Sequence, residues 1–364
     1  MMYHKINNLK IKITIMGMIK IPQAAISKFE KNYPEIFATG NLAEGKWNKE
    51  LAQFFKTYTR SKYAMAFSSN GSGLLAILML LKKHRGYKRV FIQSNTMYGV
   101  KTIAVTSGLD LVGCVPCSLP ALMPTAKQVS EFLNNISNPQ DCVFLATHVG
   151  GIVNPEIVEI ADICMKKGVA LVEDCAHSLG ATLDGKHTGL FGVAGVYSLY
   201  ATKAIAAGEG GIAVSDDEEL GKQLDKFQIY DRFDQKEEIG VNFRISELQA
   251  LFSFSICELS EAIIENKAAI ADRYIAACKQ AGIEYVDPYN NGQRGNHYKF
   301  SIIAKENATA EFSAIKNRTS PVYDYTLGAD PYLVHQKHIC LPIWYGLEEE
   351  IIQATVEQVL ASGK

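Results

Sequence analysis

The segment from 169 to 211 constrains the fold of this chain more than any other part of its sequence. An apolar run at 169–172 ends in the acidic pair Glu173 and Asp174, and a second apolar run at 196–200 leads to Lys203. A glycine-rich turn at 208–211 follows. Short apolar runs that end in polar residues are typical of buried strands, and ligands of open α/β sheets bind beyond such strand ends. The segment therefore predicts a ligand site.

A lysine beside a strand-end aspartate is what a pyridoxal phosphate enzyme requires. The lysine amine forms a Schiff base with the cofactor, and the carboxylate keeps the pyridine nitrogen protonated, so that the ring accepts electrons. Lys203 and Asp174 are of the right type for these two catalytic roles. Taken singly, a lysine is usually a solvated surface charge, and a strand-end aspartate often caps a helix. The pair favours pyridoxal 5'-phosphate as the cofactor.

The residues around this pair resemble the DegT/DnrJ/StrS family of sugar aminotransferases. In that family the strand end reads ED-x-A-[QH]-x-x-G, a serine precedes the Schiff-base lysine by five residues, and GEGG follows. The same order and spacing occur here in Glu173, Asp174, Ala176, His177, Gly180, Ser198, Lys203 and the turn 208–211. Each piece alone is weak evidence, whereas the combination is specific. The resemblance implies an aminotransferase of the aspartate aminotransferase fold type I.

A turn of small residues, 68–73, lies between a predicted strand and a predicted buried helix at 74–84. Small residues at a helix start let backbone N–H groups and the positive end of the helix dipole meet a phosphate. The lysine of a Walker motif is absent, which disfavours a nucleotide P-loop. The turn resembles the family segment SNGTAAL. This resemblance implies that Gly71, Ser72 and Gly73 hold the cofactor phosphate and that Ser198 adds a hydroxyl.

The resemblance also indicates which residues contact the cofactor ring. The family places glutamine or histidine at the position of His177, where it contacts the cofactor. Its ring-stacking aromatic residue falls on Met97, beside Tyr98, so this chain departs from the pattern. We expect Met97 at the cofactor, where its polarizable sulfur would cover the ring. Two alternatives stay open: Tyr98 stacks instead, or both residues belong to the core.

The segment 240–249 resembles the family motif GYNYRMSE. In the family, its asparagine reaches the cofactor phosphate of the neighbouring subunit. Carried over, Asn242 completes the site of a partner, which implies a homodimer with shared active sites. From the residues alone, Asn242 is a turn residue before Ser246 and Gln249, which form a capping box at the start of a helix.

Apolar runs alternate with helical patterns up to residue 214, which predicts a mostly parallel sheet flanked by helices. With 364 residues the chain is long enough for two lobes. Together with the resemblance, this predicts an α/β large domain at 21–255 around a seven-stranded sheet, and a smaller α+β domain at 256–364. Lysines interrupt the apolar residues of 1–20, so we expect an N-terminal arm or extension there, not a signal peptide.

Composition excludes several other classes of function. The formal net charge is −1, with acids and bases mixed along the chain, so no basic stripe suggests nucleic acid. The apolar runs are too short to span a bilayer, and we expect a cytoplasmic protein. Cys114 and Cys117 form a CxxC, but no second CxxC or histidine pair accompanies it, so we expect no metal site.

The expected reaction moves an amino group from an amino acid to a nucleotide-linked keto-deoxysugar, in the biosynthesis of amino sugars or surface polysaccharides. The resemblance favours L-glutamate as the donor. Lys203 would carry the proton between cofactor and substrate carbons, as base and then as acid. Two alternatives remain: a sugar dehydratase-like member, although such relatives have histidine in place of the lysine, and a cofactor-binding protein with a regulatory role and no turnover.

Overall fold

The computed structural model describes residues 19–230 and 238–363. Most of the predicted N-terminal arm, 1–20, therefore lies outside the described residues. A sheet of seven strands forms the centre of the structure. Its order is β1 (Tyr63–Phe67), β9 (Gly211–Ser215), β8 (Ala194–Ser198), β5 (Ala170–Cys175), β4 (Cys142–Thr147), β2 (Arg89–Gln93) and β3 (Asp110–Val115). The strands from β8 to β3 are parallel, and β9 is antiparallel to both of its neighbours. The predicted α/β class and mostly parallel seven-stranded sheet are confirmed.

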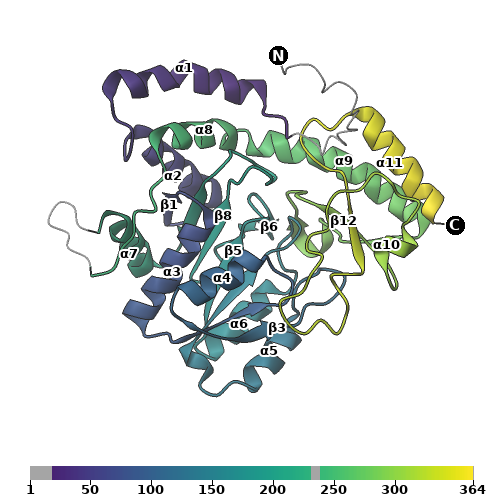
Figure 1. Cartoon of the computed structure of the whole chain (residues 1–364), viewed down its shortest axis with the longest axis horizontal. Coiled ribbons are helices and arrows are strands. Elements are labelled where there is room, and N and C mark those ends of the chain that lie inside the picture. The colour runs from purple at the N-terminus through teal and green to yellow at the C-terminus, as the bar shows by residue number, and fades with distance from the viewer. Residues whose placement is uncertain (1–18, 231–237, 364) are drawn as a thin grey trace, which may run out of the picture.

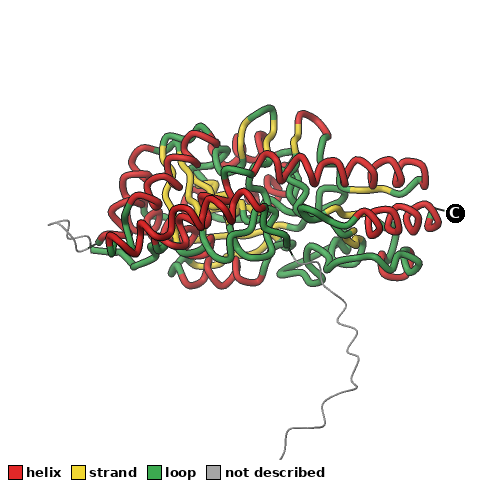
Figure 2. Tube along the Cα trace, turned by 90° about the horizontal axis from the view of Figure 1, so that it is seen from above, coloured by secondary structure: helices red, strands yellow, loops and turns green. Residues whose placement is uncertain are grey.

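Helices cover both faces of this sheet (Figure 2). The helices of this part of the chain are α1 (Gln23–Thr39), α2 (Lys46–Thr59), α3 (Asn70–Arg85), α4 (Tyr98–Thr106), α5 (Ala126–Asn134), α6 (Ile157–Lys166), α7 (Glu218–Ile229) and α8 (Glu247–Cys257), and α1 packs on α8. Successive residues of a strand point to opposite faces. In β4, Val143 and Leu145 accordingly pack in the cluster that contains α3, while Phe144 packs in the cluster that contains α5 and α6. Because both faces are buried, the central strands are apolar almost throughout.

The predicted capping box at the start of α8 forms only in part. The Ser246 hydroxyl accepts a 3.3 Å hydrogen bond from the Gln249 N–H, as expected. The Gln249 side chain does not return to Ser246. It donates instead to the carbonyls of Ala207 and Glu209, at 2.7 Å each. This side chain thus ties α8 to the loop that follows Lys203.

A second, three-stranded antiparallel sheet follows in the order β10 (Glu284–Tyr285), β12 (Phe300–Ile303) and β13 (His338–Leu341). The long helix α9 (Ser260–Ala281) leads away from the large sheet and packs with α11 (Glu349–Ser362) beside this second sheet (Figure 1). The short helix α10 (Ala308–Glu311) lies near β13. These elements are of the predicted α+β kind, and the domain boundaries at 255 and 256 stay a prediction. No helix of the described residues is long and apolar enough to cross a membrane.

Candidate active site

The carboxyl ends of β4 and β5 meet the start of α3, and Asp174 lies at this junction. Its side chain is buried, at 2% exposure. The Oδ1 atom accepts hydrogen bonds from the Ala176 N–H at 3.0 Å and from the Asn70 side chain at 3.1 Å. The Oδ2 atom accepts a 3.4 Å hydrogen bond from the Thr147 hydroxyl. These bonds fix the orientation of the carboxylate. Asn70 was not among the predicted site residues, although it stands inside the recognised turn.

Burial sets the electrostatics of this carboxyl group. It raises the pKa of Asp174, and the Ala176 N–H, the Lys203 amine and the Asn70 amide act in the opposite direction. Because a buried carboxylate is costly without a compensating positive charge, the site favours a cationic group beside Asp174.

The neighbouring acid, Glu173, braces the end of β5. It accepts hydrogen bonds of 2.7 Å from the backbone N–H groups of Gly189, Phe191 and Gly192. The His148 ring donates to the same carboxylate at 2.8 Å from Nε2, because its Nδ1 already accepts from the Asn154 N–H. His148, Glu173 and Cys175 are close enough to hold a metal ion. Since these bonds occupy both carboxylate oxygens, we interpret the group as structural support for Asp174.

Lys203 lies in the loop between β8 and β9. Its Nζ is 5.2 Å from the centroid of the Tyr298 ring and makes no hydrogen bond or ion pair within the part of the chain that the structure describes. Burial lowers the pKa of Lys203 to about 8, with Asp174 raising it and Lys299 lowering it further. A substantial fraction of this amine is therefore neutral near neutral pH, as a nucleophile requires.

The start of α3 offers free backbone donors. Ser69 and Ser72 form a reciprocal capping box, in which each hydroxyl accepts from the backbone N–H of the other residue. The N–H groups of Asn70 and Gly71 have no partner among residues 19–230 and 238–363. Unpaired N–H groups at a helix start form a site for anions. The N–H of Gly73 already donates to Ser69, so its predicted contact with a phosphate stays a prediction.

Ser198 comes near this helix start through the glycine turn. Ser198 pairs with Gly211 of β9. A Cβ atom at Gly211 would lie only 2.2 Å from the Ser69 carbonyl oxygen. Glycine is thus required for β9 to pass so close to the start of α3. Ser198 is buried at the end of β8, where its hydroxyl accepts a 3.2 Å hydrogen bond from the Tyr200 N–H.

His177 is buried between two tyrosine rings. The ring of Tyr298 is 4.5 Å away between centroids, and that of Tyr323 is stacked on it at 5.8 Å. Its Nδ1 accepts a 3.5 Å hydrogen bond from the Gly150 N–H, and Nε2 lies 3.4 Å from the Tyr323 hydroxyl. Burial, with the charges of Lys203 and Lys299, holds the pKa of His177 well below its usual value. His177 is thus a neutral side chain near Asp174 and Lys203.

Tyr298 and Tyr323 were not predicted as site residues. They precede β12 and β13, far along the chain from Lys203, and no local motif marks them. Tyr323 stands in the segment 318–338, where the resemblance to the family is poor. Its hydroxyl is near Asp174, whose charge adds to burial in raising the pKa of Tyr323. Only the three-dimensional fold brings these rings to the site.

Met97 and Tyr98 lie at the edge of the site with exposed side chains. Their exposures are 52% and 62%, so the alternative that both belong to the core of this chain is wrong. Tyr98 donates its N–H to the Tyr325 hydroxyl at 2.8 Å, which ties the start of α4 to the segment 318–338. Contact between Met97 and the cofactor stays a prediction.

Asn242 is exposed and lies in a turn. Its side-chain oxygen accepts a 3.4 Å hydrogen bond from the Arg244 N–H just before α8 begins. The next residue, Phe243, accepts a 2.7 Å hydrogen bond from the Ser68 N–H, so this turn runs beside the end of β1. The predicted contact of Asn242 with a partner subunit stays a prediction.

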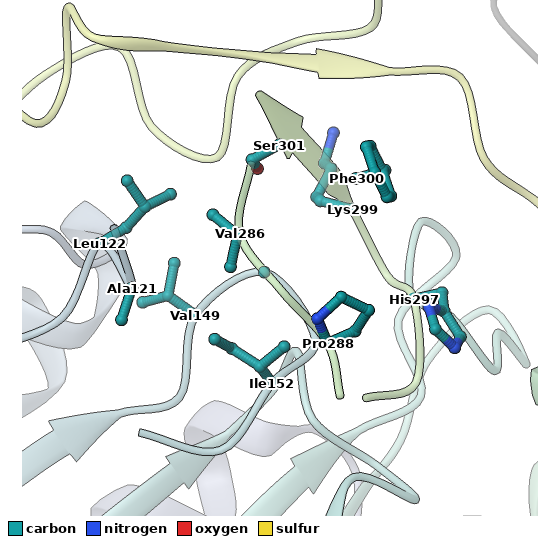
Figure 3. Close-up of a pocket in the computed structure, with 11 residues that line it drawn as sticks. Ala121, Leu122, Val149, Ile152, Val286, Pro288, His297, Lys299, Phe300 and Ser301 are labelled. Atoms are coloured by element: carbon teal, nitrogen blue, oxygen red, sulfur yellow. The ribbon is translucent and has the colours of Figure 1, made fainter. Parts of the chain in front are cut away.

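Two cavities lie beside these residues. The one in Figure 3 has about 10 Å³ between Val149, Ile152 and Pro288, which is room for about one water molecule. The other has about 560 Å³, and Lys203 and Tyr298 line it. That volume is in the range of small-molecule sites. Of these two cavities, the larger one has room for a substrate at Lys203 and the smaller one does not.

The family model of the DegT/DnrJ/EryC1/StrS aminotransferases matches residues 24–360. The chain belongs to this family. The match extends from α1 into α11, so it includes the seven-stranded sheet, the sheet of β10, β12 and β13, and the site residues described above. The predicted family and the predicted class of enzyme, an aminotransferase, are confirmed.

Solved structures of similar fold include members of the same family. The chain is similar to the aminotransferase TlmJ from Streptoalloteichus hindustanus, with 22% identity, a TM-score of 0.80, and coverage of 95% of this chain and 99% of the other. It is also similar to Helicobacter pylori PseC, an aminotransferase involved in pseudoaminic acid biosynthesis, with 18% identity, a TM-score of 0.79, and coverage of 95% and 97%. A third similar structure is DesI, solved in the presence of its TDP-sugar product, with 17% identity, a TM-score of 0.81, and coverage of 95% and 91%. At these identities the likeness establishes the fold alone.

Proposed function

We propose that this aminotransferase uses pyridoxal 5'-phosphate to move an amino group from an amino acid, L-glutamate, to the ketone of a nucleotide-linked deoxysugar. The observation that carries the proposal is the Lys203 amine, which lies near the buried carboxylate of Asp174 at a cavity of about 560 Å³. Its lowered pKa and its lack of a hydrogen-bond partner in the described chain suit a reactive amine better than a structural one.

The residues present fit the cofactor. The unpaired N–H groups of Asn70 and Gly71, with the Ser198 hydroxyl, would hold its phosphate. Asp174 would hold the protonated ring nitrogen, since burial of this carboxylate favours a cation beside it. When bound, pyridoxal 5'-phosphate supplies an aldehyde that captures amines and a ring that accepts electrons.

Lys203 would move the proton. With a pKa of about 8, about a tenth of this amine is neutral at pH 7, far more than for a lysine with the usual pKa of 10.5. It therefore takes a proton as the neutral amine and returns it as the ammonium, which is most efficient when the pKa lies near the working pH. The Tyr298 ring, 5.2 Å from Nζ, restricts where this amine can move. His177 stays neutral beside it and adds no positive charge.

Two proteins of similar structure support the proposed keto-sugar substrate: PseC, which is involved in pseudoaminic acid biosynthesis, and DesI, which was solved in the presence of its TDP-sugar product. The family supports the proposal further, because it is a family of aminotransferases. The proposed donor is the one that the family resemblance implies. Whether the ketone is at the 3 or the 4 position of the sugar depends on loops around the cavity.

A homodimer with shared sites is part of the proposal. Asn242 is exposed and would reach the cofactor phosphate of a second subunit. Mixing two impaired variants, Lys203→Ala and Asn242→Asp, tests this, since each mixed dimer then contains one site with both native residues. We expect the mixture to regain activity that neither variant has alone. Activity no higher than the average of the two would contradict shared sites.

The proposed function is tested by half-reactions of the purified protein. We expect the visible absorption band of the bound cofactor to disappear on addition of L-glutamate, and 2-oxoglutarate to form in an equal amount. The protein with its aminated cofactor is then mixed with a panel of nucleotide-linked 3-keto and 4-keto sugars. The sugar that restores the visible absorption band is the acceptor. A band that no amino acid changes would instead favour the alternative of a cofactor-binding protein without turnover.

A further inference from the structure

The cavity beside Lys203 has an unusual distribution of charge. The side chains that line it include five lysines and one arginine, and no aspartate or glutamate of the described residues lines it. The basic residues are Lys20, Lys203, Lys267, Lys299, Lys316 and Arg318. In the whole chain 37 basic residues face 38 acidic ones, so composition does not explain this excess. A concave site lined by one sign of charge concentrates ligands of the opposite sign. The cavity is therefore suited to an anion.

Lys267 differs from the other basic residues of the cavity. It stands on α9 and is only 2% exposed, and its amine makes no hydrogen bond or ion pair with any residue in the described parts of the chain. Lys20 by contrast is paired with Glu348, and Lys299 donates to Ser320. Lysine is almost never fully buried unless it is paired. The Lys267 amine thus lies at the cavity with unused donors.

The surroundings of Lys267 make the unpaired amine costly in the free protein. Among the described residues, Lys299 acts on the charge of this amine and His297 is affected by it, and neither is an acid. Burial, followed by Lys299, lowers the pKa of Lys267 to about 7. Methionine, of nearly the same length, would fill this place without a charge to desolvate. Packing alone therefore gives no reason for a lysine here.

We propose that Lys267 binds an anionic group, a carboxylate or a phosphate, of the molecule that reacts at Lys203. The identity of that molecule rests on the proposed function. Under it, two sources can supply the anion: the carboxylates of the amino donor, and the diphosphate of the nucleotide sugar. Both would place a negative charge in the cavity that Lys203 and Lys267 line together. An anion beside Lys267 would supply the negative hydrogen-bond acceptor that this amine lacks among the described residues.

Binding of two probes, measured by titration calorimetry on the full chain loaded with cofactor, tests this proposal. Glutarate stands for the donor carboxylates, and inorganic pyrophosphate stands for the diphosphate. In Lys267→Met we expect the dissociation constant of one probe to rise by about ten- to a hundredfold, the loss typical of a charge-assisted hydrogen bond. The affected probe identifies the source. Lys267→Arg keeps the charge and should restore most of the affinity.

The control is Lys279→Met, which removes an exposed lysine of the same helix, and it should bind both probes as the native protein does. Unchanged affinity of Lys267→Met for both probes would overturn the proposal, as would a native protein that binds neither. Neither measurement requires turnover. If the half-reactions fail while the Lys267 variant still loses a probe, the proposed function is wrong and the anion site stands.

Discussion

Lys203 and Lys267 line the same cavity, yet their amines lie among different charges. Lys203 is near the buried carboxylate of Asp174. Burial lowers the pKa of Lys203 and the charge of Asp174 raises it, so that the pKa of Lys203 is about 8. No acid of the described residues acts on Lys267, and burial, followed by the charge of Lys299, lowers the pKa of Lys267 to about 7. The low exposure of a lysine side chain therefore does not by itself determine its role. An amine with an acid nearby suits proton transfer, and one without an acid suits binding of an anion.

The largest effect expected from this comparison is that of Lys203→Ala. Removal of the amine takes away both the nucleophile and the proton carrier, so we expect the turnover number to fall by at least about a thousandfold. The measurement is the rate of amino transfer under saturating donor. The variant Lys267→Met in the same assay should mainly raise KM, since it retains the reacting amine. Native rates in Lys203→Ala would remove the distinction between the two lysines.

The next largest effect is expected from Asp174→Asn, which removes the acid that sets Lys203 apart. We expect turnover to fall by about a hundredfold, as for the loss of one preorganised electrostatic partner. Because Asp174 raises the pKa of Lys203, the apparent pKa of the amine should also fall. Profiles of rate against pH measure both effects. Thr147→Val is the control, since it removes a 3.4 Å hydrogen bond to Asp174 and leaves the charge in place. A pKa that rises in Asp174→Asn would contradict the assignment.

The sequence predicted one of these two lysines and missed the other, for a physical reason. Lys203 and Asp174 follow apolar runs that end in polar residues, and this local pattern could be recognised in the sequence. The same apolar runs predicted the strands of the seven-stranded sheet. Lys267 stands in an amphipathic helix, where the sequence pattern predicts that a lysine faces solvent. Its burial depends on segments that come later in the chain and line the same cavity, such as 298–299 and 342–345.

The same limit applies to the aromatic residues of the site. The family pattern places a stacking aromatic ring at position 97, but this chain has Met97 there, and its contact with the cofactor stays a prediction. Tyr298 and Tyr323 lie beside His177 instead, and both come from segments after α9. Contacts between residues so distant in sequence have no local signal. The alternation of strands and helices could therefore be predicted, and the composition of the pocket wall could not.

A third prediction concerns stability, where the unpaired amine of Lys267 should be a liability. Below about pH 7 the amine is charged in both the folded and the unfolded chain, and the folded state bears the full cost of desolvating it. Between pH 7 and its usual value of 10.5, only the unfolded chain holds the proton, so native stability rises with pH in this window. Lys267→Met should thus be more stable than the native protein, by on the order of a few kcal/mol at pH 7.

Chemical denaturation of the native protein and Lys267→Met at several pH values measures this difference. We expect the advantage of the variant to shrink as pH rises from 7 to 10.5. Lys279→Met, on the same helix but exposed, should show no such trend. A variant that is less stable than the native protein at pH 7 would mean that Lys267 has a structural partner, and the contrast with Lys203 would then fail.

The smallest effect is expected from Tyr298, whose ring lies 5.2 Å from the Lys203 amine. The face of an aromatic ring attracts a cation by about 0.5–1 kcal/mol at such a distance, so the ring stabilises the charged form of the amine. Tyr298→Leu should therefore lower the pKa of Lys203 by about half a unit, and Tyr298→Phe, which keeps the ring, should leave it unchanged. Labelling of cofactor-free protein with trinitrobenzene sulfonate across pH, followed by mass spectrometry of the Lys203 peptide, reports the neutral fraction. A higher pKa of Lys203 in Tyr298→Leu than in the native protein would mean that the exclusion of water by the ring outweighs its attraction for the cation. The near-neutral pKa of Lys203 would then depend more on Tyr298 than on the balance between burial and Asp174.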